Sequence, residues 1–270
     1  MQNKCDRILT GLLLALGIAS FSAESIAAPS TEDLAFAATL LEAEKGSATA
    51  QFELGRLYAR MQDYDNALKW YGAAAAQGNA SAQNRLGVMY DNGQGVVQDY
   101  TKAREWYEKA AAQGDPYAQN GLATLYDAGN GVPQDYAIAH ELYQLAAAQG
   151  NASAQSNLGV MYQHAQGVPQ SYTIASEWYK KAAEQGIDSA QFNLGGLYYR
   201  GLGVPQDYAK AREWFAKAAE QGHPSAQNNL GSLYLHGEGG PRDVRMAKKL
   251  FKEACENGNQ AGCNNSQSVN

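Results

Sequence analysis

Apolar and polar positions follow a helical period through most of the chain. One segment places apolar residues four apart, at Ala82, Leu86 and Tyr90. This spacing puts them on one face of a helix. A second apolar stripe, spaced by three and four, lies at Ala103, Trp106, Tyr107, Ala110 and Ala111. The pattern therefore predicts two amphipathic helices in succession.

The helix pair recurs along the chain. The pattern A-Q-x-x-L-G-x-x-Y starts every 36 residues, at Ala82, Ala118, Ala154, Ala190 and Ala226. A further pair, Ala50-Gln51, lies 32 residues before Ala82. One helix pair cannot bury its apolar stripe alone, so neighbouring pairs must stack. We therefore expect an all-α protein, a right-handed α-solenoid of about six tandem helix-turn-helix repeats.

Glycine and proline mark the boundaries of the predicted helices. Gly114 is placed to end a second helix in the left-handed conformation. Asp115 and Pro116 supply an N-cap and a first-turn proline for the next helix. The glycine of the repeated pattern, replaced by Ala123 in one unit, lies inside a helix, where it costs about 1 kcal/mol relative to alanine. Its recurrence predicts that another backbone approaches closely there.

Three segments of the repeat carry a family resemblance: A-x-x-x-L-G-x-x-Y, the G-V-P-Q-D-Y loop and A-x-x-W-Y-x-x-A-A-x-Q-G. The pattern resembles the Sel-1-like repeat, a relative of the tetratricopeptide repeat, over about residues 46–265. The resemblance implies an α-solenoid with a scaffold or adaptor role. It also implies that the first helix of each pair lines a concave surface.

The repeat boundaries divide the chain into four parts. Residues 1–27 form a predicted signal peptide and residues 28–45 a capping helix, which starts from a Ser30/Asp33 capping box. The repeats occupy residues 46–265. Residues 266–270 form a C-terminal tail, where the repeated leucine and glycine are lost.

The first residues have the order of regions that is typical of a signal peptide. Lys4 and Arg7 precede an apolar run over residues 8–18, and small residues follow. We expect cleavage after Ala27, with Ser22 as the alternative. The apolar run is shorter than the roughly 18 residues of a membrane span, and no later stretch is long enough. The sequence therefore predicts a periplasmic or secreted protein without a membrane span.

The charge of the chain disfavours two classes of partner. The formal net charge is −6, and removal of residues 1–27 deletes two basic and two acidic residues. No basic stripe is present for nucleic acid, which requires clustered lysine and arginine. An acidic protein also binds an anionic membrane surface poorly.

Two cysteines remain after the predicted cleavage. Cys255 takes a repeated alanine position on a second helix, and Cys263 takes the glutamine position on the next helix. These positions face each other across a turn, and cysteines of an exported chain most often pair. The spacing also resembles that of cysteine-rich secreted members of the family. We therefore expect a Cys255–Cys263 disulfide.

The remaining chemistry favours a protein that is not an enzyme. Most tyrosines and all tryptophans occupy repeated positions, which indicates core residues. The four histidines form no H-E-x-x-H motif, so we expect no metal and no cofactor. No G-x-S-x-G nucleophile motif is present. A β-lactam-binding or hydrolysing activity, attributed to some cysteine-rich relatives, stays as the alternative without a residue to carry it.

The non-consensus positions of the first helices are the candidate binding residues. They are Asn84, Asn120, Ser156, Phe192 and Asn228 directly after the Ala-Gln pairs, and Asp91, Asp127, Gln163 and Tyr199 further along the same face. The repeated asparagines can both donate to and accept from a peptide backbone. We expect a monomer that binds a protein or peptide there. An ordinary solvated helix face on a passive envelope spacer is the other interpretation.

Overall fold

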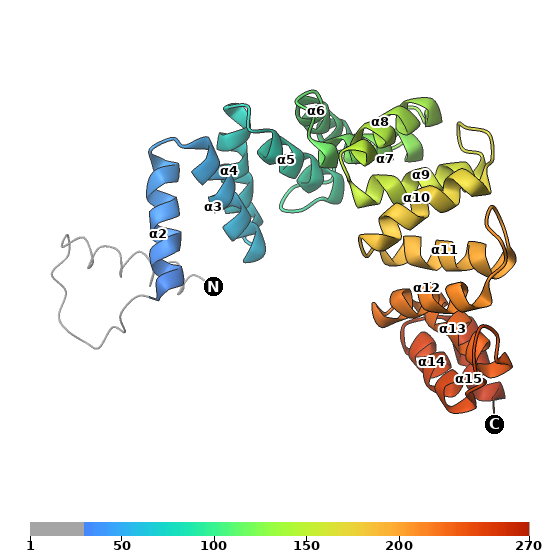
Figure 1. Cartoon of the computed structure of the whole chain (residues 1–270). Helices are drawn as coiled ribbons and strands as arrows, with labels where there is room; N and C mark the ends of the chain where they lie inside the picture. The colour runs from blue at the N-terminus through green and yellow to red at the C-terminus, as the bar shows by residue number, and fades with distance from the viewer. Residues whose placement is uncertain (1–29, 270) are drawn as a thin grey trace, which may run out of the picture. The chain divides into compact units, whose positions relative to one another are not determined.

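The structure is a computed structural model that describes residues 30–269, in which every regular element is a helix (Figure 1). The first helices of the six pairs are α3 (Ala48–Arg60), α5 (Ala80–Asn92), α7 (Pro116–Ala128), α9 (Ala152–His164), α11 (Asp188–Arg200) and α13 (Pro224–His236). The second helices are α4 (Tyr64–Ala76), α6 (Tyr100–Ala111), α8 (Tyr136–Ala148), α10 (Tyr172–Glu184), α12 (Tyr208–Glu220) and α14 (Val244–Glu256). Helices α2 (Thr31–Glu44) and α15 (Gln260–Ser268) stand at the two ends.

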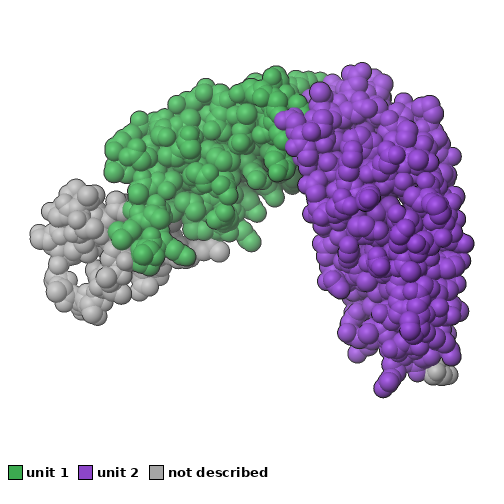
Figure 2. All heavy atoms as spheres, viewed as in Figure 1, with its two compact units in different colours: residues 1–121 green, residues 122–270 purple. Residues whose placement is uncertain are grey.

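This architecture confirms the predicted all-α fold of six tandem helix pairs. The predicted signal peptide lies outside the described residues. Residues 266–268, assigned above to a tail, continue helix α15. The chain divides into two compact units, residues 1–121 and residues 122–270 (Figure 2).

Within each unit, consecutive helices pack on each other in chain order. In residues 122–270, α9 packs on α10, α11 on α12 and α13 on α14, and each second helix also packs on the next first helix. Each element therefore contacts mainly its sequence neighbours, as in other repeat arrays.

In five of the six repeats a buried glutamine links the first helix to the elements on either side. Gln191 Nε2 donates to the carbonyl oxygen of Ala183 (3.1 Å), and Gln191 Oε1 accepts from Gln221 Nε2 (2.9 Å). Gln221 also donates to the carbonyl oxygen of Gly186 (3.0 Å). Because buried polar groups require partners, these bonds explain the repeated Ala-Gln pair. The same links recur at Gln51, Gln83, Gln155 and Gln227.

The helical glycine of the repeat makes room for an aromatic ring. A Cβ on Gly195 would lie 2.8 Å from Phe215 Cδ1, while the nearest backbone atom, the oxygen of Ala211, would be 3.3 Å away. The expected backbone approach is therefore wrong in detail, since the closest neighbour is a side chain. The same arrangement recurs at Gly55, Gly87, Gly159 and Gly231.

The helix ends follow the predicted capping. Ser30 and Asp33 form the capping box of α2. Gly114 has a φ of 86°, in the left-handed region. The second helices start from a capping acid or serine, at Asp63, Asp99, Asp135, Ser171, Asp207 and Asp243.

The aromatic residues divide between core and surface. The second-helix tyrosines are buried, as predicted, at Tyr71, Tyr107, Tyr143 and Tyr179. Most first-helix and all post-loop tyrosines are only partly buried. Three tryptophans are also partly buried, and each ring lies 4.1 Å from a lysine Nζ, at Trp106, Trp178 and Trp214. These tryptophans therefore line the surface of the second helices and are covered by lysine side chains.

Candidate functional site

Three of the predicted binding residues, Asp91, Asp127 and Phe192, contact the buried second-helix aromatic of their own repeat. We call the predicted binding positions the first-helix stripe: the residue after each Ala-Gln pair from Asn84 onward, and the residue seven positions later. In the fifth repeat the first of these positions contacts the ring directly, since Phe192 and Phe215 have ring centroids 5.8 Å apart. In two repeats the second position is an acid that is hydrogen-bonded to the hydroxyl of that ring, in the pairs Asp91–Tyr107 and Asp127–Tyr143. These residues border the core, and all of them except the buried Asn84 and Ser156 keep part of the side chain in solvent.

In residues 1–121 the stripe contains a carboxylate bonded to a buried phenol. Tyr107 Oη donates to Asp91 Oδ2 over 3.2 Å. Burial raises the pKa of Asp91, and the bond from Tyr107 partly offsets this. Burial and the nearby Asp91 charge raise the pKa of Tyr107. Asn84 is 7% exposed and its Oδ1 has no partner among the described residues, whereas Asn120 is partly buried.

In residues 122–270 the stripe opens with an equivalent pair. The Tyr143 hydroxyl is hydrogen-bonded to the Asp127 carboxylate and to Asn157. Burial raises the pKa of Asp127, and the Tyr143 bond opposes the effect. Asp127 Oδ1 has no hydrogen-bond partner within residues 30–269. This carboxylate is thus half-buried and only partly satisfied.

The next repeat keeps the geometry without the bond. Tyr179 is 0% exposed, and neither its Oη nor Gln163 Oε1 has a partner among the described residues. Gln163 Nε2 contacts His164 Nε2 over 3.2 Å. Ser156, the other stripe residue of this repeat, is 6% exposed. Gln163 and Tyr179 therefore occupy the positions of Asp127 and Tyr143, but Gln163 Oε1 and Tyr179 Oη lack a hydrogen-bond partner among the described residues.

The stripe becomes aromatic toward the C-terminus. Phe192 stacks on His223 with ring centroids 4.6 Å apart and 19° between planes. His223 also caps α13, since its Nδ1 accepts from the amide of Ala226 (3.2 Å). Tyr199 is 39% exposed and meets the ring edge of Tyr208.

The final repeat is tied to the C-terminal helix. Asn228 Oδ1 accepts from Asn265 Nδ2 over 2.8 Å, which joins α13 to α15. The second stripe position is Leu235, which is partly buried. Through residues 122–270 this position therefore changes from acid to amide, then to phenol and aliphatic side chain, at Asp127, Gln163, Tyr199 and Leu235.

The nine predicted binding residues lie on first helices of the two units, and the structure exposes them unequally. Asn84 and Ser156 are buried, so they are poorly placed for direct contact with a partner. Sequence reasoning missed the role of Tyr107 and Tyr143 as hydrogen-bond donors to the acidic residues. A signal for them exists, because each tyrosine follows its acid by 16 residues in consecutive repeats.

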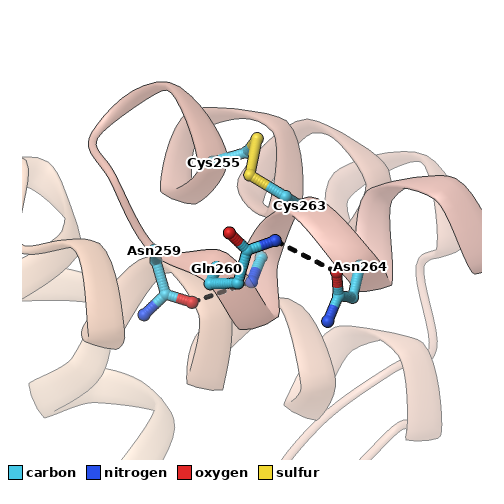
Figure 3. The surroundings of a disulfide bond; sticks show 6 residues. Cys255, Asn259, Gln260, Cys263 and Asn264 are labelled. Atoms are coloured by element: carbon cyan, nitrogen blue, oxygen red, sulfur yellow. Dashed lines mark hydrogen bonds between the residues drawn. A yellow bond between two sulfur atoms is a disulfide. The ribbon is translucent and has the colours of Figure 1, made fainter.

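The predicted disulfide is present at the end of the array. Cys255 of α14 and Cys263 of α15 are joined by an S–S bond of 1.99 Å, with their Cα atoms 4.5 Å apart (Figure 3). Asn259 accepts from the amide of Gly262 and starts α15 at the same turn. Gln260 bonds to Asn264 one turn later (Figure 3). The disulfide fastens the short last helix to the final repeat.

Residues 30–269 contain no group of three or more histidine, cysteine, aspartate or glutamate residues that could hold a metal ion. None of the helices in this range is long and apolar enough to cross a membrane.

Comparison with known proteins identifies the repeat. The Sel1 repeat model matches residues 48–79, 80–115, 116–151, 152–187, 188–223 and 224–259. No curated protein matches the chain.

Solved structures show the same likeness. The protein c5321, a protective antigen of uropathogenic Escherichia coli strains with an SLR fold, is 40% identical with a TM-score of 0.76. The match covers 84% of this chain and 50% of that one, so the chain spans half the length of this relative. A Sel1 repeat protein from Oxalobacter formigenes is 32% identical with a TM-score of 0.74, covering 81% and 87%. Immunity protein Pa5087 from Pseudomonas aeruginosa, 21% identical with a TM-score of 0.50 over 80% and 84%, is similar in fold alone.

Proposed function

The chain belongs to the Sel1 repeat family, whose solenoids generally mediate protein–protein interaction, and we propose that it is an exported adaptor that binds a protein or peptide along the first-helix stripe. One observation carries this proposal. The core positions are the same from repeat to repeat. The second stripe position instead changes from Asp127 to Gln163, Tyr199 and Leu235. A constant scaffold with a varied, partly exposed stripe fits recognition of one partner along several repeats.

Export rests on two features of this chain. Residues 1–27 have the order of a signal peptide. The Cys255–Cys263 disulfide suits an oxidising compartment. The likeness to c5321, a protective antigen, also supports a place in the envelope or outside the cell. N-terminal sequencing of the mature protein from the periplasm and the medium tests this, with a first residue of Ala28 expected.

Site-specific photocrosslinking in intact cells tests the adaptor function. The crosslinking residue p-benzoylphenylalanine would replace Tyr199, which is 39% exposed on the stripe. The control would replace Leu145, which is 55% exposed on second helix α8. We expect one defined protein adduct from position 199 and none from position 145. Equal adducts from both positions, or turnover of nitrocefin by the purified chain without any adduct, would contradict the proposal.

A further inference from the structure

We infer that the fourth repeat, residues 152–187, is a built-in joint of residues 122–270, at which helix α10 opens before the neighbouring second helices α8 and α12. The inference goes beyond the proposed function and holds whether or not a partner binds. It follows from departures of this repeat from its neighbours at both ends of α10 and in its core.

The end of α9 carries a residue in a strained backbone conformation. Ala165 is the C-cap of α9 and has a φ of 57°, in the left-handed region. Within residues 30–269 the only other residue besides glycine with a positive φ is Gln62, in the tight turn of the first repeat. A Cβ makes this conformation more costly for alanine than for glycine. The equivalent residues of the other repeats are glycines, at Gly93, Gly129, Gly201 and Gly237.

The start of α10 has a weaker cap than the other second helices. Ser171 Oγ accepts from the amide of Ile174 over 3.3 Å. At the start of α8, Asp135 Oδ1 accepts from two amides, those of Ala137 (2.9 Å) and Ile138 (3.1 Å). An acid at this position also interacts favourably with the helix dipole, whereas an uncharged serine does not. Of the six second helices, only α10 starts without an aspartate cap.

The core of the repeat contains a hydroxyl group without a bond. Tyr179 is 0% exposed, and its Oη has no hydrogen-bond partner within residues 30–269. The equivalent Tyr143 hydroxyl is bonded to Asp127 and Asn157. The fifth repeat has Phe215 at this position, which carries no hydroxyl. A buried polar group without a partner loses its bonds to water, and it regains them when the helix opens.

The helix that follows α10 also begins without a side-chain cap. Ile187 is the N-cap of α11 and provides no side-chain hydrogen bond. The equivalent Asn151 caps α9, since its Oδ1 accepts from the amide of Ala154 over 2.9 Å. Loss of such a cap weakens the first turn of a helix. Helix α10 therefore lies between a strained C-cap on one side and an uncapped helix start on the other.

The architecture of the array confines these costs to the fourth repeat. Contacts run mainly between sequence neighbours, and α10 packs on α9 and α11. The stability of each repeat is then close to a sum of its own terms and its two interfaces. Elements with the lowest local stability open first under native conditions. Because Ser156 and Gln163 of the stripe lie on α9, opening of α10 removes the support of this part of the stripe.

Native-state amide hydrogen exchange, measured by mass spectrometry on the purified full chain, tests the inference. We expect the amides of α10 to exchange about tenfold faster than those of α8, a helix of the same length. Ala165→Gly should slow exchange in α10 about fivefold, because it removes the strain at the C-cap. The reciprocal variant Gly129→Ala should speed exchange in α8 by a similar factor and leave α10 unchanged.

Two further substitutions separate the buried hydroxyl from a general effect of changing a core tyrosine. Tyr179→Phe should slow exchange in α10, because it removes the unpaired hydroxyl and keeps the ring. Tyr143→Phe should speed exchange in α8, because Asp127 loses its donor. Exchange in α10 that is no faster than in α8, no response to Ala165→Gly, or faster exchange in both phenylalanine variants would overturn the inference.

Discussion

Two adjacent glycines of α11 occupy opposite environments. A Cβ on Gly195 would lie 2.8 Å from Phe215 Cδ1, whereas a Cβ on Gly196 would meet only Arg200 Nη2 at 3.6 Å. Gly195→Ala should therefore lower the free energy of unfolding by about 1–3 kcal/mol through overpacking. Gly196→Ala should raise it by about 0.5–1 kcal/mol through helix propensity. Urea unfolding followed by circular dichroism measures both changes in the free energy of unfolding. Changes of the same sign in the two variants would show that the Phe215 ring does not restrict a side chain at Gly195.

Asp91 predicts a pH-dependent stability. Burial raises the pKa of this carboxyl in the folded state. Its stabilising contribution is complete below the unfolded pKa of about 4 and is lost as pH rises through the folded pKa. Asp91→Asn should therefore stabilise the chain at pH 7, by less than about 1 kcal/mol because the site is half-exposed. This gain should vanish below about pH 4.

Asp99 provides the control for that titration. Its bond from the Lys102 amide lowers the pKa of Asp99, so the sign is reversed. Its contribution is present at neutral pH and is lost as pH falls through the folded pKa. Asp99→Asn should destabilise the chain at pH 7. Urea titrations of both variants at pH 7 and pH 3.5 measure the changes in the free energy of unfolding. Changes of the same sign for both variants at pH 7 would contradict the opposite pKa directions of Asp91 and Asp99.

At the scale of the helix, the buried glutamines hold consecutive elements together. Gln191 bonds to Ala183 of α10 and to Gln221 after α12. Gln191→Leu should cost about 1–3 kcal/mol because it leaves buried polar groups unpaired. The double variant with Gln221→Leu should cost less than the sum of the two single variants. Full additivity in urea unfolding would mean that the two side chains act independently.

The Cys255–Cys263 disulfide should stabilise one element, the last helix α15. It closes a short loop between α14 and α15, for which the chain-entropy model gives roughly 2–3 kcal/mol. Replacing Cys255 and Cys263 by serine should raise amide hydrogen exchange strongly in α15 and little in α9 or α10. Uniform exchange across residues 122–270 would show that the disulfide stabilises the whole unit instead of its last helix.

The helices and their order could be predicted from the sequence because the apolar period, the glycine C-caps and the acidic N-caps are local signals. The candidate site was predicted only by position. Asn84 looks like an open polar residue, yet its burial depends on how α5 packs in three dimensions. The bond between Asp91 and Tyr107 likewise requires two helices to meet at a given register. Such contacts are not encoded by periodicity alone.

At the scale of the whole molecule, contacts run mainly between sequence neighbours. A repeat array then has a stability that is close to a sum of local terms. Gly55 in the first repeat and Gly195 in the fifth face different rings, Tyr71 and Phe215, and share no contacting residue. A substitution of either glycine should therefore change the stability of its own repeat alone.

This locality predicts additivity for distant repeats and coupling within one repeat. Gly55→Ala and Gly195→Ala should combine additively to within about 0.5 kcal/mol. Gly195→Ala with Phe215→Leu should instead be less damaging than the sum, because the smaller side chain relieves the crowding at Gly195. Hydrogen exchange should rise near α11 and α12 in Gly195→Ala and near α3 and α4 in Gly55→Ala. Strong coupling between the two distant glycines would mean that the chain unfolds as one cooperative body, in which local substitutions weaken every repeat alike.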